Sequence, residues 1–254
     1  PPGDASHESL FGPPIHGGDR EVRLAGPDEI PAVLALRARA FRGGKADRDN
    51  FDATSLHLWV GRPAGAAGEG PQATLRLRRH TDARALLQGY AAQHYDLTAM
   101  SAAGGTTLEL GRLCAEPGAG EADLLRLLWA GVARVALVTG AARLIGCTSF
   151  HTTDVAGLDP AWALLKARHL GPVDLAPRVK AAETYAFGTV TATPEAASAS
   201  LLPPLLRAYL AMGGWVSDHA VIDRDLGTCH VFTCVDIDRL PPARRRVLEQ
   251  MAAS

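Results

Sequence analysis

The feature that most constrains the fold is a run of residues 106–150 in which an apolar strand, a glycine-rich turn, a long helix and a second apolar strand follow one another. The two strands are predicted at Thr106–Cys114 and Leu144–Phe150, and the helix at Glu121–Thr139. Apolar residues recur along the helix at near-helical spacing, namely Leu124, Leu128, Val132, Val135 and Val138. Strands that alternate with such helices form a sheet covered by helices, so the sequence predicts a mixed α/β fold.

Strands and helices also alternate through the rest of the chain. Strands are expected at 20–25, 54–61, 72–80, 215–223 and 229–237, and helices at 26–41, 82–97, 159–170, 203–214 and 241–251. The first helix has Asp28 as its expected N-cap and tolerates Pro31 in its first turn. Residues 1–19 are expected to form a flexible N-terminal arm, and residues 20–254 a single domain.

Composition excludes several classes of function. Hydrophobic residues make up 47% of the 254 residues and the formal net charge is −1, so no strongly basic field points to a nucleic-acid partner. The apolar run around Arg134 is too short for a membrane span. Four cysteines stand at no metal-ligand spacing, which predicts free thiols in a reducing cytoplasm and no metal site: Cys114, Cys147, Cys229 and Cys234.

Arg37 is a charged residue on the apolar stripe of the first helix, which also contains Ile30, Leu34 and Phe41. Its side chain either extends outward to solvent or points inward. An inward guanidinium needs a carboxylate, because a buried unpaired charge is costly. The expected partners follow in the stretch "ADRDNFD", which holds Asp47, Asp49 and Asp52, although a solvated acidic loop is the alternative for all three.

Glu109 and Arg112 are charged residues within a strand that is otherwise apolar. Side chains three positions apart project to opposite faces of a regular strand, but Gly111 indicates a bulge that re-aims them. Burial raises the pKa of a carboxyl group unless a cation offsets it, and a carboxylate tuned in this way can act as a general base. The structural alternative is an ion pair of Glu109 with Arg76, Arg37 or Arg112.

The turn "EPGAGEADLL" opens the long helix. Backbone N–H groups at such a helix start bind anions, and a phosphate fits there. The turn lacks the GxGxxG and GxxxxGK[ST] spacings, which disfavours dinucleotide or nucleoside triphosphate binding.

These motifs together resemble two known families. "RARAF", "DRDNFD", "TLRL" and "ELGR" resemble the acyl-homoserine-lactone synthases, whose active-site pattern falls here on Arg37, Phe41, Asp49, Asp52, Arg76, Glu109 and Arg112. A longer resemblance runs from about Arg20 to Arg239 and includes "HYDL", "ELGRLCAEP", "IGCTSFHTTD" and "LPPLLRAYLAMGGWVSDHAVIDRDLGTCHVF". It is to the bacterial L-ornithine Nα-acyltransferases, a hemolysin-like group in the acetyltransferase (GNAT) superfamily.

The second resemblance implies a fold and a reaction. The expected fold is a GNAT-like, mostly antiparallel sheet, splayed between the strands at 106–114 and 144–150, with helices on both faces. The expected reaction moves a 3-hydroxyacyl chain from acyl carrier protein to the α-amine of L-ornithine and gives a lyso-ornithine lipid. Glu109, directly or through a water, is the expected base, while Arg112 and Arg37 hold carboxylates. Asp49 and Asp52 suit either the ornithine side chain or the arginines, and Phe41 and Arg76 complete the substrate site.

The same resemblance implies how the acyl donor is held. The phosphopantetheine arm of the carrier protein is expected to contact Leu113, Cys114, Gly118, Ala119, Gly120 and Phe150, and no tightly bound cofactor is expected. The loop "AEPGAG" departs from the loop of acetyl-CoA-using relatives, which wraps a pyrophosphate that the carrier's prosthetic group lacks. This departure favours a carrier-protein donor.

Acyl carrier proteins are acidic, so a basic docking face is expected among Arg126, Arg134, Arg143, Lys166, Arg168, Arg178 and Lys180. The expected location is the cytoplasm, and the basic tail helix with Arg244, Arg245 and Arg246 offers peripheral contact with anionic lipid of the inner membrane. Two alternatives remain: the same fold with another amine acceptor, or a non-catalytic protein that binds acyl carrier or lipid.

Overall fold

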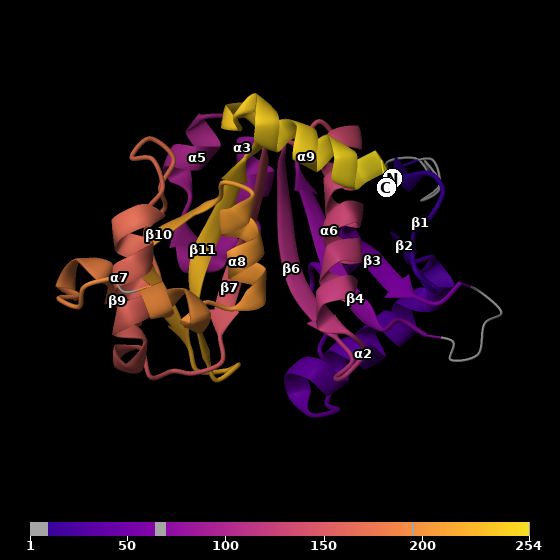
Figure 1. Ribbon diagram of the computed structural model, residues 1–254, viewed down its shortest axis with the longest axis horizontal. Helices are drawn as coiled ribbons and strands as arrows, with labels where there is room; N and C mark the ends of the chain where they lie inside the picture. The colour runs from indigo at the N-terminus through magenta and orange to yellow at the C-terminus, as the bar shows by residue number, and fades with distance from the viewer. Residues whose placement is uncertain (1–9, 64–69, 195, 254) are drawn as a thin grey trace. The chain divides into compact units, whose positions relative to one another are not determined.

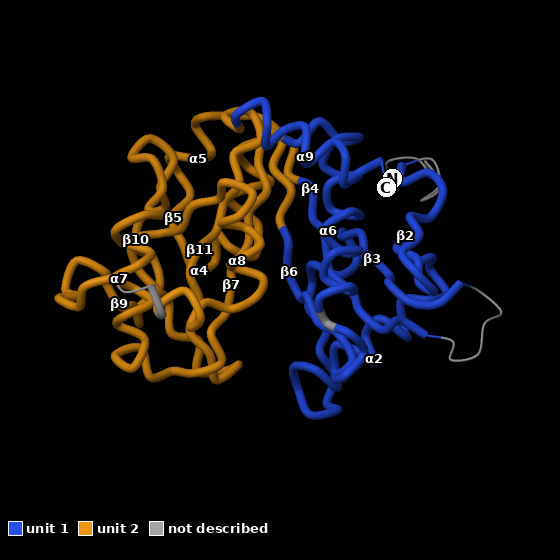
Figure 2. The backbone as a smooth tube through the Cα atoms, in the orientation of Figure 1, with its two compact units in different colours: residues 1–79, 110–141, 241–254 blue, residues 80–109, 142–240 orange. Residues whose placement is uncertain are grey.

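The computed structural model describes residues 10–63, 70–194 and 196–253 (Figure 1). The chain divides into two compact units, each assembled from separate stretches (Figure 2). Unit 1 contains the residues up to Arg79, Leu110–Ala141 and the residues from Pro241 on, whereas unit 2 contains His80–Glu109 and Ala142–Leu240.

Unit 1 is built on a sheet with the strand order β1-β2-β3-β4-β6. Neighbours from β1 to β4 pair antiparallel. The strands are β1 (Ile15–Gly17), β2 (Arg20–Leu24), β3 (Leu56–Gly61), β4 (Ala73–His80) and β6 (Thr107–Ala115). The helices are α2 (Ile30–Arg42), α6 (Glu121–Val138) and α9 (Pro242–Ala253), with short 3-10 turns at Pro27–Glu29 and Asp52–Thr54. Because β4 and β6 supply residues to both units, no linker marks the boundary, which explains why the sequence predicted one domain.

Helices cover both faces of the sheet of unit 1. Adjacent residues of β3 project to opposite faces, and α6 packs on the face of Leu58 while α2 packs on the face of Trp59. Gly131 permits the close approach of α6, since a Cβ there would lie 3.0 Å from Val22 and 3.1 Å from Leu58. On the other face, Val33 of α2 packs with Ala25 and Trp59.

Unit 2 is built on a second set of antiparallel strands, in the order β7-β11-β10-β9. These are β7 (Arg143–Phe150), β11 (Thr228–Asp236), β10 (Trp215–Asp223) and β9 (Thr184–Ala186). A small two-stranded sheet pairs β5 (Tyr95–Asp96) with β8 (Arg178–Val179). The helices are α3 (Ala83–Leu87), α4 (Ala91–His94), α5 (Thr98–Ala102), α7 (Asp159–Arg168) and α8 (Pro204–Ala211), with 3-10 turns at Ala156–Leu158, Phe187–Thr189, Ala196–Leu201 and Ile237–Arg239.

Both faces of this sheet are also covered. Val231 of β11 packs into a cluster with Trp162 of α7 and Leu206 of α8, whereas Phe232 packs into a second cluster with Ala91 of α4 and Met100 of α5. Neighbouring side chains of β11 point to opposite faces of the sheet and therefore pack into two separate hydrophobic clusters. The mixed α/β class, the mostly antiparallel pairing and the helices on both faces are confirmed, and the splay between the strands at 106–114 and 144–150 stays a prediction.

Three local predictions differ from the structure. The expected flexible arm is wrong for residues 10–19, because β1 pairs with β2 and Phe11 and Ile15 are buried; residues 1–9 lie outside the described ranges. The helix expected at 82–97 is divided into α3 and α4. The caps of the first helical segment are Gly26 and Glu29 instead of Asp28.

Residues 152–200 contain α7, at the place where a helix was expected at 159–170, and also β8 and β9, which the sequence left unassigned. β9 pairs antiparallel with β10, and Tyr185 of β9 donates a hydrogen bond from its hydroxyl to Asp159 at the start of α7. In the described ranges, no helix is both long and apolar enough to cross a membrane.

Candidate active site

A buried network of ion pairs lies in unit 1 and begins with Arg37 of α2. Its side chain is fully buried, and its guanidinium donates from Nε to Asp47 at 2.8 Å and from an Nη atom to Asp52 at 2.6 Å. Of the two orientations that the sequence left open for Arg37, the structure shows the inward one, with two of the expected aspartates as partners. The solvated acidic loop is wrong for Asp47 and Asp52, both of which are buried.

Three further arginines join this network. Arg76 of β4 donates to Asp49 at 2.6 Å and to Asp52 at 2.8 Å. Arg112 of β6 donates from Nε to Asp47 at 3.1 Å and lies 3.6 Å from Asp49. Arg42 of α2 lies 3.7 Å from Asp47. Each of the three aspartates thus has a guanidinium partner, which avoids the cost of an uncompensated buried charge.

The aspartates differ in how many of their carboxylate oxygens already accept hydrogen bonds. Burial by itself raises the pKa of Asp52, but hydrogen bonds from Arg37, the backbone N–H of Asp49 and Arg76 lower it to about 2. Asp52 is therefore an anion fully engaged by the arginines. One oxygen of Asp49, Oδ2, is buried and has no hydrogen-bond partner in the described part of the chain.

The depressed pKa of Asp52 predicts acid sensitivity. Because the pKa in the folded state is about 2 and the ordinary value is 3.8, the unfolded chain takes up this proton first as the pH falls. The stabilising contribution is complete above pH 3.8 and is lost as the pH falls through about 2. Denaturant titrations over this range should show a steeper fall in the free energy of unfolding for the parent than for Asp52→Asn. The exposed control Asp28→Asn should follow the parent; equal slopes in parent and Asp52→Asn would contradict the assignment.

Arg112 has a strained backbone within β6. Its φ is 53°, the left-handed region, and among the described residues no other non-glycine residue has a positive φ. The irregularity that the sequence predicted next to Gly111 is thus found at Arg112 itself. Left-handed backbone at such a residue costs about 1–3 kcal/mol and persists where surrounding contacts hold it, here the ion pairs with Asp47 and Asp49.

Aromatic rings flank the network. Phe41 of α2 lies beside the guanidinium of Arg112, with 5.9 Å between the guanidinium carbon and the ring centroid. Phe51 lies 5.6 Å from Arg76 and 4.7 Å from Arg78 by the same measure. Rings in these positions favour guanidinium groups through cation–π attraction.

Glu109 lies in unit 2 and binds different partners from those that the sequence suggested. Its carboxylate accepts hydrogen bonds from the backbone N–H of Ala91 at 2.6 Å and of Tyr90 at 3.1 Å, and Oε2 lies 2.9 Å from Nε2 of His80. The suggested ion pair with Arg76, Arg37 or Arg112 is wrong, because those arginines bind aspartates. Gly89 makes room for the pair, since a Cβ there would lie 2.9 Å from Glu109 and 3.0 Å from His80.

These contacts set the charge of Glu109. Burial raises the pKa of its carboxyl group, but hydrogen bonds with His80 and with the two backbone N–H groups outweigh burial and leave the pKa below its usual 4.5. Glu109 is therefore an anion at neutral pH, and its side chain is almost completely buried. It anchors the first turn of α4 and fixes the imidazole of His80.

The loop before α6 has the backbone that an anion site needs. Gly118 and Gly120 have φ angles of 75° and 80°, and Gly120 is the N-cap of the 18-residue helix. The guanidinium of Arg20 lies 3.5 Å from the position that a Cβ on Gly120 would take, and its Nε donates to Gln72 at 2.7 Å. A cation thus adjoins the helix start, and Ala119 lies between the two glycines.

The other residues expected to contact the donor are mostly buried. Cys114 is buried, and burial raises the pKa of its thiol to about 12, so it is not a thiolate. Leu113 is half-buried in β6. Phe150 is buried in unit 2, where its ring meets Trp162 edge-on with 4.6 Å between centroids.

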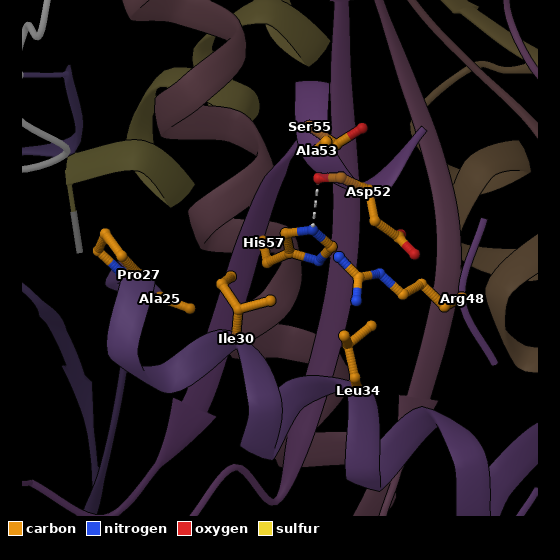
Figure 3. A pocket seen from close by; sticks show the side chains of 9 residues that line it. All are labelled: Ala25, Pro27, Ile30, Leu34, Arg48, Asp52, Ala53, Ser55 and His57. Atoms are coloured by element: carbon orange, nitrogen blue, oxygen red, sulfur yellow. Dashed lines mark hydrogen bonds between the residues drawn. The ribbon is translucent and has the colours of Figure 1, made fainter. Parts of the chain in front are cut away.

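A cavity of about 240 Å³ in unit 1 lies against the same loop as the ion network (Figure 3). Ile30 and Leu34 of α2 contribute apolar side chains to its lining. The other lining residues are Ala25, Pro27, Arg48, Asp52, Ala53, Ser55 and His57. His57 is buried, and burial lowers the pKa of its imidazole, which is therefore neutral at physiological pH. A ligand in this cavity would contact the turn that presents Asp52 to the arginines.

Comparisons with known proteins fit this architecture. Residues 33–130 match the family model described as an acetyltransferase (GNAT) domain. The chain is 34% identical over 240 residues to an L-ornithine N(alpha)-acyltransferase of Rhodobacter capsulatus, covering 89% of this chain and 93% of that protein. The chain belongs to the L-ornithine Nα-acyltransferase family. A second relative of the same name, from Brucella abortus, is 31% identical over 252 residues, covering 88% of this chain and 86% of that protein.

Among solved structures, a CoA-dependent acyl-homoserine lactone synthase aligns with a TM-score of 0.44 and 10% identity, over 92% of this chain and 95% of that one. Membership of the L-ornithine Nα-acyltransferase family, together with the GNAT domain, makes this chain an N-acyltransferase. The resemblance that the sequence motifs suggested is thereby confirmed.

The candidate site includes residues that the motifs did not indicate. His80 is the last residue of the strand "ATLRLRRH". In the sequence it is a polar residue next to a turn, and no local pattern predicts its contact with Glu109. Arg20 and Gln72 meet at the helix start from distant parts of the sequence. Only a correct pairing of β4 with β6 would have found the first of these contacts.

The basic residues expected to dock an acidic partner are only partly available. Arg143 is buried and bonded to the carbonyl oxygen of Gly104, so it is wrong as a docking residue. Arg134 donates to two carbonyl oxygens, those of Pro13 and Ala252, and Lys180 donates to that of Ala92. Arg126, Arg168 and Arg178 are exposed.

Proposed function

We propose that the chain transfers a 3-hydroxyacyl group from acyl carrier protein to the α-amine of L-ornithine, giving a lyso-ornithine lipid. The observation that carries the choice of acceptor is the similarity over nearly the whole chain to proteins named L-ornithine N(alpha)-acyltransferase. The buried acid and the buried arginines fit an enzyme better than a passive binder, because both cost stability unless they are used.

In the proposed reaction, the neutral amine attacks the thioester carbonyl carbon, a C–N bond forms, and the C–S bond breaks to release the thiol of the carrier. Ornithine arrives mostly protonated, so a group on the enzyme must accept a proton. Glu109 and its partner His80 supply that group, and holding amine and thioester together supplies much of the remaining acceleration. Arg112 orders Asp47 and Asp49 from the same strand that carries Glu109.

The donor is proposed to be acyl-phosphopantetheine on a carrier protein, with no tightly bound cofactor. The left-handed glycines and Arg20 support a single phosphate at the start of α6. Leu113, Cys114 and Phe150 remain proposed contacts of the arm. The carrier is proposed to dock on exposed basic residues such as Arg126, and the exposed Arg244, Arg245 and Arg246 of α9 are proposed to contact anionic lipid at the inner membrane from the cytoplasmic side.

The test is the release of free thiol from 3-hydroxyacyl carrier protein, with and without L-ornithine, and with 3-hydroxyacyl-CoA as the control donor. Ornithine-dependent release from the carrier protein and much less from CoA supports the proposal. Ornithine-independent release, or release with other amines in preference to ornithine, contradicts the acceptor. Equal release from both donors contradicts the carrier-protein assignment.

Asp49 is proposed to help bind the cationic side chain of ornithine through Oδ2, which makes no hydrogen bond within the described residues and lies 3.6 Å from the guanidinium of Arg112. Asp49→Asn keeps the shape but removes the charge, so KM for ornithine is expected to rise about 10-fold, the loss of one charge-assisted hydrogen bond. KM for the acyl donor should stay unchanged. Steady-state kinetics with each substrate varied measure both values, and Asp28→Asn is the exposed control. An equal rise in both KM values would show that Asp49 serves only the arginine network.

A further inference from the structure

His80 has one ring nitrogen bonded and one left over. The residue ends β4 and is 1% exposed. Nε2 lies 2.9 Å from Oε2 of Glu109, an ionised carboxylate that only accepts hydrogen bonds. The proton of this bond therefore belongs to Nε2, and neutral His80 carries a lone pair on Nδ1.

The free nitrogen is buried. Nδ1 of His80 has no hydrogen-bond partner in the described ranges. A buried acceptor without a partner costs about 1–3 kcal/mol, so such atoms are rare unless they have a function. The other side of the ring is packed, because Gly89 lies against Cε1 and Nε2. The chain thus holds the imidazole at one nitrogen and leaves the other without a hydrogen bond to any residue that the structure describes.

Glu109, by contrast, is a poor final acceptor for a proton. Three donors already bind its two oxygens, from His80, Tyr90 and Ala91, and its pKa lies below the ordinary value. Protonating the carboxylate would disrupt these hydrogen bonds. Imidazoles as a class change charge near neutral pH, and an anionic carboxylate on the far nitrogen stabilises the imidazolium form.

We propose that Nδ1 of His80 is the atom that takes the proton of the attacking amine, and that Glu109 is the positioning residue that fixes the tautomer. This rests on the proposed function. As the C–N bond forms, one N–H proton moves from the acceptor nitrogen to Nδ1. When the C–S bond breaks, the sulfur leaves with the electron pair, and the imidazolium returns the proton to it. Amine and thioester thus become amide and thiol, with His80 unchanged.

The surroundings of the pair support a proton that moves only through His80. The groups that face it are Glu109 of β6 and, through Glu109, the two N–H groups at the start of α4. Tyr209 of α8 interacts electrostatically with Glu109, but burial raises the pKa of its phenol well above 10, so it stays neutral.

His80→Gln is the decisive variant, because a glutamine amide can still donate to Glu109 but offers no base at the position of Nδ1. We expect kcat for ornithine-dependent thiol release to fall about 10²–10⁴-fold, with KM for the acyl donor unchanged. In His80→Gly, added imidazole should restore part of the rate, which a purely structural role of His80 would not allow. A kcat of His80→Gln within about threefold of the parent would overturn the proposal.

A second readout does not depend on turnover. Nitrogen-15 NMR of the parent should show His80 protonated at Nε2 and bare at Nδ1 near neutral pH, with a mixed tautomer in Glu109→Gln. Protonation at Nδ1 in the parent would refute the assignment. If the parent fails to use ornithine but shows the expected tautomer, the acceptor in the proposed function is wrong and the His80–Glu109 base stands.

Discussion

Replacing Arg37 with methionine is expected to lower the free energy of unfolding by about 3–5 kcal/mol. The guanidinium is fully buried and is shared by Asp47 and Asp52 at 2.8 and 2.6 Å. Methionine fills similar volume but leaves two buried carboxylates short of a cation, and desolvated charges of one sign repel each other. Denaturant unfolding followed by circular dichroism measures the difference.

Two variants separate charge from shape in this experiment. Arg39→Met changes the same helix at an arginine that is 55% exposed and pairs with Glu116, so a loss below about 1 kcal/mol is expected. Adding Asp47→Asn and Asp52→Asn to Arg37→Met removes the unpaired charges and should restore part of the stability. A loss from Arg37→Met as small as that from Arg39→Met would show that the network does not hold unit 1 together.

Arg37 also shows how far sequence alone can go. Its place on an apolar stripe, with three aspartates within 15 residues, offered a buried ion pair as one of two alternatives, and the structure shows that ion pair. The same local reasoning predicted β10 with the bounds that the structure has and β7 to within one residue, since period-2 patterns and flanking turns specify a strand locally.

Where a contact depends on pairing across the sheet, local patterns failed. The structural alternative for Glu109 was an ion pair with an arginine, yet its side-chain partner is His80, 29 residues away on another strand. The left-handed backbone of Arg112 also leaves no trace in the sequence, because arginine rarely adopts it and only the surrounding ion pairs hold it there. Phe11 and Ile15 looked like part of a flexible arm because a three-residue edge strand is too short to show a period.

The second large effect is expected for Glu109→Gln, which should reduce kcat about 10²–10⁴-fold. Glutamine has nearly the same shape, but its amide has one accepting oxygen where the carboxylate has two. It can accept from Ala91 or from His80 and Tyr90, and the remaining donor faces an NH₂ group. The imidazole then loses both its fixed tautomer and the negative charge that stabilises its protonated form. Single-turnover measurements of amide formation with saturating carrier and ornithine isolate this step.

Because the carboxylate also anchors α4, the same variant must be tested for a purely structural loss. Glu21→Gln is the matched control: Glu21 is as buried as Glu109 and pairs with Arg23 at 3.2 Å, in a place that no proposed step uses. Both variants should lose stability, but only Glu109→Gln should lose kcat at a temperature where both are folded. If Glu109→Gln keeps the parental kcat although α4 becomes less stable, Glu109 only anchors the helix and has no part in catalysis. The buried carboxylate, with its two backbone N–H donors and its imidazole partner, would then have a structural role only.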